Sequence, residues 1–421
     1  MTGRAALVPF DSLFPVLDLL RSVGPITRSE LVRATGLTRK VVSQRVDELI
    51  AAGFAEESGM GPSTGGRAPR EVRFRPGEAH VLVAELASTS MTVGIADLGG
   101  SVIAQAHEAA GVVAGPDAAI DHVEELFDEL LAARPPGSPP VWGVGIGVPG
   151  PVATATGRPV GALSIPEWAQ YPVRERLAAR YDVPVWVEND ANLMALGELR
   201  AGIARTHRDV LFIEIADGIG GAVVASGELH RGALGFAGEF GHIVVDPAVT
   251  ERCWCGRTGC LTQVAGGRAL ARQGQLAARE GRSRILAAIA AQGRRISARE
   301  VFTAAAAGDP VSAQILTRAG EHLGAVTAVL VSAFNPSLVL VDAGFVSIDD
   351  PLVAAFRATV LDRCLPAAGG LQFAVSPLGN SAGLIGAAFT VVDALFSARH
   401  LDQWCAQGSP VGLADVIHKN P

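Results

Sequence analysis

The chain of 421 residues has few aromatic side chains and no long unbroken apolar segment, and its first residues lack the charged-then-apolar pattern of a leader, so we expect no secretory signal. Aromatic residues make up only 5% of the sequence, whereas glycine and proline number 49 and 25 within a chain that is 49% hydrophobic. This mixture predicts a glycine-rich α/β protein with small-residue packing and excludes a disordered chain. The longest apolar stretch, 325–346, is interrupted by Asn335-Pro336 and Asp342. It therefore predicts a helix, a turn and a buried strand rather than a membrane span.

Cysteine is also scarce, and three of the five cysteines lie within eight residues. Cys253, Cys255 and Cys260 follow His242 at a spacing that suits a closed tetrahedral zinc site. A disulfide fits poorly, because Cys253 and Cys255 are too close in sequence to bridge comfortably and one of three cysteines would stay unpaired. We therefore predict that these four residues bind a structural Zn²⁺; a chance cysteine cluster in a loop is the alternative. Metal-type cysteines and the missing secretory signal favour a reducing cytoplasm.

The net charge of −7 is unevenly distributed along the chain. Residues 1–76 contain eleven Arg or Lys against eight Asp or Glu, whereas the remainder contains 24 against 34. A basic terminal module on an acidic body is typical of a nucleic-acid binder with an attached sensor, although an excess of +3 is modest.

Residues 1–78 predict a winged helix-turn-helix domain. Apolar residues recur at helical spacing over 14–20, and Thr27-Arg-Ser-Glu30 has the form of a capping box that opens a helix to about Thr35. Gly36 then permits a tight turn, and Thr38 can cap a longer helix that ends near Ala52. A second helix that begins with hydrogen-bond donors is the arrangement that enters the major groove of DNA.

Two strand-like runs, 54–57 and 71–74, flank a loop that resembles the wing of such a domain. The start of the second helix and the wing together supply side chains that can contact base edges or the phosphate backbone. An ordinary solvated helix face followed by a plain linker is the alternative. The predicted DNA contacts are Thr38, Arg39, Lys40, Ser43, Gln44, Arg45 and Arg67.

The body that follows predicts a sheet with polar side chains at a strand end. Runs 81–86, 91–97, 141–151 and 184–188 predict strands, and Asn189 and Asp190 come directly after the last of them. Ligands of such sheets bind at the carboxyl ends of the strands. The order of several motifs in this body resembles the ROK group of repressors, uncharacterised reading frames and sugar kinases, over residues 80–396. Besides the cysteine cluster, the motifs are Gly147-Val-Pro-Gly150, Glu188-Asn-Asp-Ala-Asn192, Asp217-Gly-Ile-Gly-Gly221, Gly238-Glu-Phe-Gly-His242, Asn335-Pro336 and Leu378-Gly-Asn-Ser-Ala-Gly383-Leu-Ile-Gly386-Ala-Ala388.

This resemblance implies a two-lobed actin-like (ribonuclease H-like) ATPase fold with a sugar between the lobes. It implies a sensor domain over 79–396, with a small lobe at about 79–195 plus 381–396 and a large lobe at about 196–380. By motif position, Asn189, Asp190, Glu239 and His242 match the sugar-contacting residues of the family. In its kinases Asp190 would be the general base. From the residues alone, Asp190 as a helix cap and Glu239 as a surface carboxylate are the alternatives.

The sequence departs from the kinases of the family where they bind phosphate. Glu85-Leu-Ala87-Ser88-Thr89-Ser90 stands in place of Asp-x-Gly-Gly-Thr-Lys, so both glycines and the lysine are missing. Asp217 replaces a threonine of the second phosphate loop, and Asp342-Ala343 replaces paired glycines. Together these changes predict that the protein does not bind ATP and is not an enzyme.

Two further departures affect the sugar side of the site. Thr262 replaces a glutamate that contacts the sugar in the family, and Ser164 replaces an asparagine. The ligand would then be a sugar that lacks or modifies one hydroxyl, another small molecule, or none.

The resulting prediction is a transcriptional regulator of the repressor branch, which binds an operator in double-stranded DNA as a homodimer or homotetramer and responds to a sugar-like effector. A regulator controlled without a ligand or by a partner protein is the main alternative, and an active sugar kinase is another. Residues 397–421 extend past the usual end of the family, either as a disordered tail or as an extra packing arm.

Overall fold

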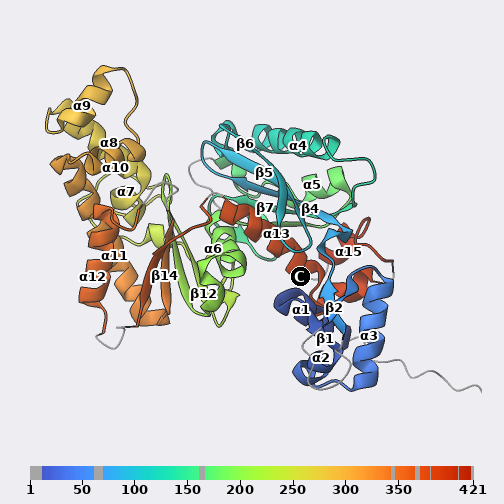
Figure 1. Ribbon diagram of the computed structural model, residues 1–421. Coiled ribbons are helices and arrows are strands. Elements are labelled where there is room, and N and C mark those ends of the chain that lie inside the picture. The colour runs from blue at the N-terminus through green and yellow to red at the C-terminus, as the bar shows by residue number, and fades with distance from the viewer. Residues whose placement is uncertain are drawn as a thin grey trace, which may run out of the picture.

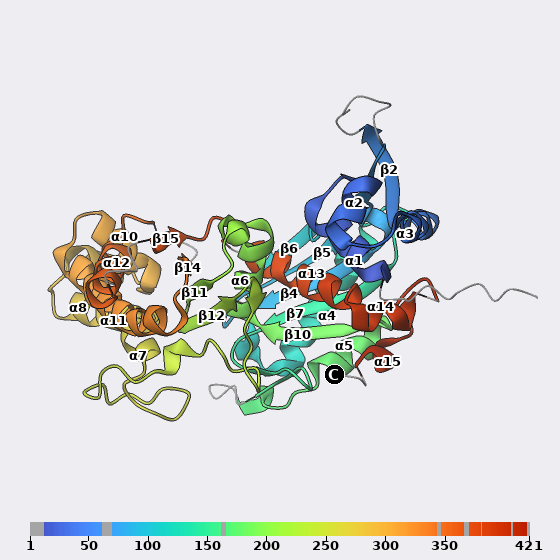
Figure 2. The same cartoon turned by 90° about the horizontal axis from the view of Figure 1, so that it is seen from below.

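The computed structural model describes residues 12–60, 70–160, 166–342, 347–365, 370–379, 381–405 and 407–418. Arg67, Ser164 and Ala343, which the sequence analysis singled out, lie outside these ranges. The described chain forms an N-terminal domain, a first lobe beside it and a second lobe at the far end of the first (Figures 1 and 2). No helix among the described residues is long and apolar enough to cross a membrane.

The N-terminal domain packs its helices against a small antiparallel sheet. Thr27 accepts a hydrogen bond from the backbone of Glu30, whose carboxylate accepts from the backbone of Thr27, so the predicted capping box is present. Gly36 adopts the left-handed conformation, with φ +69°, and the Thr38 side chain caps the next helix. The elements are α1 (Leu13–Val23), β1 (Ile26–Thr27), α2 (Arg28–Thr35), α3 (Arg39–Ala51), β2 (Ala55–Met60) and β3 (Arg70–Phe74), with sheet order β1-β3-β2.

The first lobe contains a mixed sheet of order β10-β7-β4-β5-β6, with helices on both faces. Helices α4 and α5 cover one face, and α13, which comes from the end of the chain, covers the other (Figure 1). Gly145 of β7 lies so close to α13 that a Cβ there would be 2.4 Å from the Ala387 carbonyl oxygen. The bounds are β4 (His80–Leu86), β5 (Met91–Asp97), β6 (Val102–Glu108), α4 (Pro116–Ala132), β7 (Val141–Val148), β8 (Val152–Ala153), β9 (Arg158–Pro159), α5 (Val173–Tyr181), β10 (Val185–Asn189) and α13 (Ser381–Leu395).

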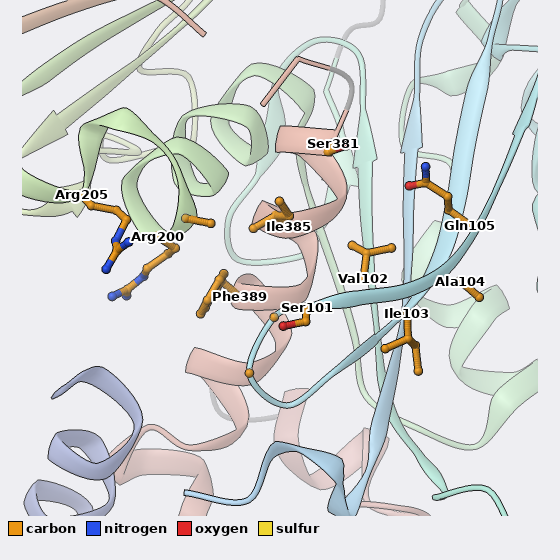
Figure 3. A pocket seen from close by; sticks show the side chains of 13 residues that line it. Ser101, Val102, Ile103, Ala104, Gln105, Arg200, Arg205, Ser381, Ile385 and Phe389 are labelled. Carbon is orange, nitrogen blue, oxygen red and sulfur yellow. The ribbon is translucent and has the colours of Figure 1, made fainter. Parts of the chain in front are cut away.

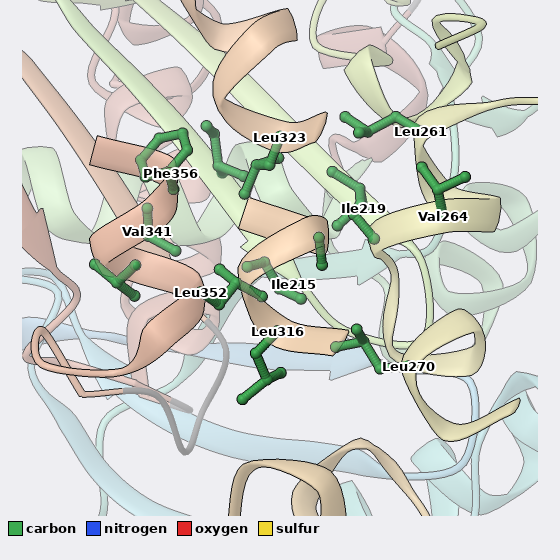
Figure 4. Packing of buried hydrophobic residues seen from close by; sticks show 14 of the residues in the cluster. Ile215, Ile219, Leu261, Val264, Leu270, Leu316, Leu323, Val341, Leu352 and Phe356 are labelled. Carbon is green, nitrogen blue, oxygen red and sulfur yellow. The ribbon is translucent and has the colours of Figure 1, made fainter. Parts of the chain in front are cut away.

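The second lobe repeats this plan, with the sheet order β13-β12-β11-β14-β15 and a helical layer. Its apolar core lies between the sheet and the helices (Figure 4). As predicted for 325–346, a helix ends at a turn at Asn335 and a buried strand follows. The bounds are β11 (Val210–Ile215), β12 (Ile219–Ala225), β13 (Glu228–Leu229), α7 (Leu261–Ala265), α8 (Gly267–Arg279), α9 (Arg284–Ala291), α10 (Ala298–Ala306), α11 (Pro310–Phe334), β14 (Leu338–Asp342), α12 (Pro351–Arg363) and β15 (Gln372–Val375).

Helix α6 (Asp190–Ala201) connects the two lobes. Its side toward α13 is packed so closely that a Cβ at Gly386 would lie 1.8 Å from the Leu193 carbonyl oxygen. Its first turn meets the second lobe, because the Cβ of Ala191 would be 3.1 Å from a Cβ at Gly220 of β12. The start of α6 therefore lies where the two lobes meet.

The C-terminal extension is a packing arm, one of the two alternatives that the sequence left open. Its helices α14 (Ala398–Trp404) and α15 (Ala414–His418) lie beside the first lobe and the N-terminal domain. Trp404 is fully buried, and its ring contacts those of Phe54, Trp142 and Phe396 at centroid distances of 5.2–5.8 Å. These rings join three parts of the chain in one apolar cluster.

Candidate functional site

Carboxylates from both lobes converge where the lobes meet. Glu85 lies near the end of β4 and Asp190 begins α6, while Glu214 and Asp342 are paired neighbours on β11 and β14. Burial, and then the charges of Asp190 and Asp342, raise the pKa of Glu85 to about 8. Burial and the same group of carboxylates raise the pKa of Glu214 well above its ordinary value. We call these four residues and Glu239 the interlobe site.

Asn189 and Asp190 are held in place by the start of α6. Asn189 is the N-cap, because its side chain accepts a hydrogen bond from the Asn192 backbone N–H at 3.0 Å. Its amide nitrogen donates to the Gly150 carbonyl oxygen at 3.1 Å and to Asp190 Oδ1 at 3.0 Å. Asp190 is thus the first helical residue and not the cap. Burial raises the pKa of Asp190 to about 7, which is the range that suits a proton acceptor or a hydrogen-bonding partner of hydroxyl groups.

Glu239 and His242 approach the same region from the second lobe. Burial, and then the charge of Asp190, raise the pKa of Glu239 to about 7, and the half-buried side chain is 30% exposed. Its Oε2 lies 3.7 Å from His242 Nε2. The structure thus brings three predicted ligand residues, Asp190, Glu239 and His242, to one side of the interlobe region. Asn189 supports Asp190 through its side-chain amide.

The four predicted metal ligands also come together. The ligand atoms of His242, Cys253, Cys255 and Cys260 all lie within 4.8 Å of one another. Cys253 Sγ is 3.4 Å from His242 Nδ1, and Cys255 Sγ is 3.5 Å from Cys260 Sγ. Around a tetrahedral Zn²⁺ with Zn–S near 2.3 Å, sulfur atoms are about 3.8 Å apart and sulfur lies about 3.5 Å from nitrogen. The geometry and the donor set therefore fit zinc.

His242 connects this cluster with the interlobe site. Its Nδ1 faces the cysteines and its Nε2 faces Glu239, so the ring can ligate a metal on one side and orient a carboxylate on the other. Burial, and then the charge of Arg257, lower the pKa of His242 to about 4, which keeps the ring neutral. The Trp254 ring packs edge-on against His242 at 4.2 Å and reaches within 3.9 Å of a Cβ at Gly150.

The residues that replace the first phosphate loop form a tight turn between β4 and β5. Ala87 N–H donates to the Ser90 carbonyl oxygen at 2.8 Å, and none of the residues 87–90 has a positive φ. The carbonyl oxygen of Ala87 accepts from the Val112 backbone N–H at 3.1 Å. A phosphate-binding nest needs successive N–H groups that point to one side, which usually requires such positive φ angles.

Two other residues that differ from the kinases of the family also form contacts within the protein. Asp217 pairs with Arg268 at 3.1 Å. Thr262 is buried and its Oγ1 accepts from the Ile219 backbone N–H at 3.1 Å, so it holds the start of β12. A threonine in this position is a structural residue and offers the site no carboxylate.

Sequence reasoning did not identify Glu214 or give Glu85 a role beyond a lost phosphate loop. The signal for Glu214 was a carboxylate inside the otherwise apolar run Val210-Leu-Phe-Ile-Glu-Ile215. A carboxylate at such a position needs a partner or a function, since an isolated buried charge is costly.

Some side chains of the predicted nucleic-acid face are exposed, whereas others form hydrogen bonds within the domain. Thr38, Arg39 and Lys40 are exposed at the start of α3. Gln44 is exposed and donates to Glu48 at 3.0 Å, whereas half-buried Ser43 accepts from Arg28 at 3.0 Å.

Arg45 departs from the prediction that placed it on this exposed face. It is only 7% exposed, its Nε donates to Ser12 Oγ at 2.8 Å, and it pairs with Glu48. The helix turns Arg45 toward α1 because it lies one turn from buried Val42 and Leu49. Its guanidinium stabilises the domain from within.

Comparisons with known proteins match both the body and the whole chain. A model of the ROK family matches residues 86–394. The xylose repressor of Bacillus spizizenii is 25% identical over 370 residues, which cover 88% of this chain and 91% of the repressor. A glucokinase of Halalkalibacterium halodurans is 32% identical over 271 residues, which cover 64% of this chain and 82% of the kinase.

Among solved structures, a ROK family transcriptional regulator that is a homolog of the E. coli MLC protein matches with a TM-score of 0.76. The match covers 94% of this chain and 98% of that chain, at 24% sequence identity. It shows the fold, and its coverage includes the N-terminal domain as well as both lobes.

Proposed function

Since the chain belongs to the ROK family and has its mixed α/β fold, we propose that it is a DNA-binding transcriptional regulator of the repressor type. A sugar or sugar-like ligand bound at the interlobe site sets its affinity for a DNA operator. The observation that carries the proposal is the combination of an N-terminal helix pair with an exposed basic start and a sugar-kinase-like body in which residues 87–90 form no phosphate nest. The domain bounds follow as 1–78, 79–396 and 397–421.

The N-terminal domain supplies the DNA-binding part of this proposal. Its helices α2 and α3 are joined by residues 36–38, and strands β2 and β3 flank the segment that the sequence predicts as a wing. Thr38, Arg39 and Lys40 lie at the N-terminal end of α3, the end that contacts base edges in helix-turn-helix proteins. Ser43 and Gln44 lie one turn further, and Arg67 belongs to the proposed wing.

The interlobe site supplies the sensor. Asp190 at the start of α6 and Glu239 of the second lobe are half-buried carboxylates with raised pKa values, and such acceptors pair well with the hydroxyl groups of a sugar ring. A ligand that bridges them would favour one relative position of the lobes, because it binds both at once. A bound Zn²⁺, held by His242, Cys253, Cys255 and Cys260, would supply a rigid support for the His242–Glu239 pair.

Ion pairs between the body and the N-terminal domain transmit a change in the relative position of the lobes to the DNA-binding part. Asp393 of α13 accepts from Arg21 of α1 at 2.6 Å and from Arg200, near the end of α6, at 2.6 Å. Helix α6 begins with Asp190 at the interlobe site and ends near this ion pair. A shift of α6 would therefore displace Arg200 and Asp393, and through Asp393 it would displace Arg21 of α1. We propose that a homodimer or homotetramer presents two such domains to paired half-sites.

The sensor is tested by a panel of neutral sugars, with melting temperature and operator binding as readouts. We expect one sugar to raise the melting temperature and to change operator affinity. Asp190→Asn should weaken its binding by about tenfold or more, because one charged acceptor worth about 1.5–3 kcal/mol is lost. Glu321→Gln, an exposed carboxylate on α11, is the matched control. Operator binding that no sugar alters would instead support a regulator controlled by a partner protein.

The kinase relatives make catalysis the second candidate, and a calorimetric titration with ATP and Mg²⁺ tests it. We expect no binding in the micromolar range, because residues 87–90 lack the positive φ angles and the lysine of a phosphate nest. Phosphorylation of a common hexose above background would show that the protein is an enzyme.

Replacing Arg39 and Lys40 by alanine tests the DNA face. Each lost phosphate contact should make the salt dependence of operator binding shallower by about one unit. The affinity should fall with no change of melting temperature, since both side chains are exposed. Arg284→Ala, an exposed arginine on α9, should change neither quantity. Equal operator affinity of the double variant and the wild type would remove the helix-turn-helix proposal.

A further inference from the structure

A cavity of about 750 Å³ lies on the first lobe away from the interlobe site. One wall is the turn at 99–101 together with strand β6, and the opposite wall is the end of α6 and the segment that follows it (Figure 3). Ile385 and Phe389 of α13 lie between these walls (Figure 3). The volume is within the range of pockets that bind metabolites of moderate size.

The charged side chains that line this cavity are all positive. Arg200 and Arg205 line it, and no carboxylate is among its lining residues in the described chain. Arg205 is exposed and has no hydrogen-bond or ion-pair partner in the described part of the chain. Figure 3 shows the side chains of Arg200 and Arg205 on the same wall of the cavity, the one formed by the end of α6 and the segment after it.

Arg200 is only half neutralised by its partner. Asp393 lies 2.6 Å from Arg200 and 2.6 Å from Arg21, so two guanidinium groups share one carboxylate. With Arg205 added, three arginines stand against the one carboxylate of Asp393, and two of these arginines, Arg200 and Arg205, line the cavity. Paired guanidinium groups are the usual protein ligands of phosphate, because they donate two hydrogen bonds each in a fixed plane.

The rest of the cavity suits the organic part of a ligand. Ser101 and Gln105 on one wall and Ser381 at the start of α13 offer hydroxyl and amide groups. The apolar surface between them comes from residues such as Ile385 and Phe389. A bare inorganic ion would leave this surface unused.

We propose that the cavity binds a small organic phosphate, of the size of a sugar phosphate or a mononucleotide, with its phosphate on Arg200 and Arg205. The bound phosphate competes with Asp393 for Arg200. Because Asp393 also holds Arg21 of α1, the cavity is a second effector site that acts on the N-terminal domain through the same ion pairs that end the route from the interlobe site.

Calorimetric titration of the full-length protein with glucose 6-phosphate, AMP and inorganic phosphate at low ionic strength tests this proposal. We expect at least one of the two organic phosphates to bind more tightly than inorganic phosphate. Arg205→Ala should weaken that binding by about tenfold or more, since a charge-assisted contact is lost. Ser101→Glu, which adds a carboxylate at an exposed position of the rim, should abolish it.

Asp393→Asn separates this site from a merely structural role of the arginines. Removing the competing carboxylate frees Arg200, so phosphate binding should become several-fold tighter while the melting temperature falls. Asp190→Asn and Arg318→Ala, an exposed arginine on α11, should leave phosphate binding unchanged. The proposal is overturned if neither organic phosphate binds at millimolar concentration. It is also overturned if Arg205→Ala binds like the wild type, or if Asp190→Asn rather than Arg205→Ala removes binding.

Discussion

Replacing Cys255 by serine is expected to abolish stoichiometric zinc and the response to the interlobe ligand, while the N-terminal domain stays folded. In small peptides, structural zinc sites contribute on the order of 10–16 kcal/mol of apparent binding free energy. The loop that carries the cysteines lies directly against the interlobe site, through His242 beside Glu239 and Trp254 beside Gly150. Loss of the metal should therefore free Glu239 and the contact with the first lobe together.

Metal analysis of the purified protein and a melting curve with the effector sugar check this prediction. Cys364→Ser is the matched control, because Cys364 is a half-buried cysteine of the second lobe outside the cluster. It should keep both the zinc and the ligand response. A wild-type protein without zinc would refute the site, and a Cys255→Ser variant with a normal ligand response would refute the coupling.

Trp404→Ala should give the largest loss of stability among single substitutions in the C-terminal extension, about 3–5 kcal/mol of unfolding free energy. The side chain is fully buried, and its Nε1 donates to the Leu395 carbonyl oxygen at 2.8 Å. Its ring also contacts Phe54 of the N-terminal domain and Trp142 of β7. The substitution would therefore leave an empty space where three parts of the chain meet. The N-terminal domain should then unfold separately from the body.

Denaturant unfolding followed by circular dichroism, with operator binding measured in parallel, tests this effect. Trp168→Ala is the control, since Trp168 is 2% exposed and donates to the Val112 carbonyl oxygen at 3.0 Å, but lies in the first lobe away from the N-terminal domain. Both variants should lose stability, and only Trp404→Ala should also weaken operator binding. A fully cooperative unfolding of Trp404→Ala with unchanged operator binding would contradict the prediction.

Local structure and the cluster of cysteines with His242 could be predicted from the sequence alone. The capping box at Thr27, the turn at Gly36 and the cap at Thr38 depend on neighbouring residues, so the sequence determines them directly. The spacing of Cys253, Cys255 and Cys260 places three thiols within one short loop whatever the rest of the chain does. The family motifs added His242, Asp190 and Glu239 because their order along the chain is distinctive.

Only the tertiary structure decided which of these side chains face one another and which face inward. Arg45 belongs by spacing to the same helix as Arg39 and Lys40, yet the packing of α1 buries it. Glu85, Glu214 and Asp342 lie far apart in sequence, and the pairing of β11 with β14 and the meeting of the lobes bring them together. The sharing of Asp393 by Arg21 and Arg200 likewise joins residues more than 170 positions apart. A local sequence pattern cannot predict such contacts, because they depend on how separately formed layers pack.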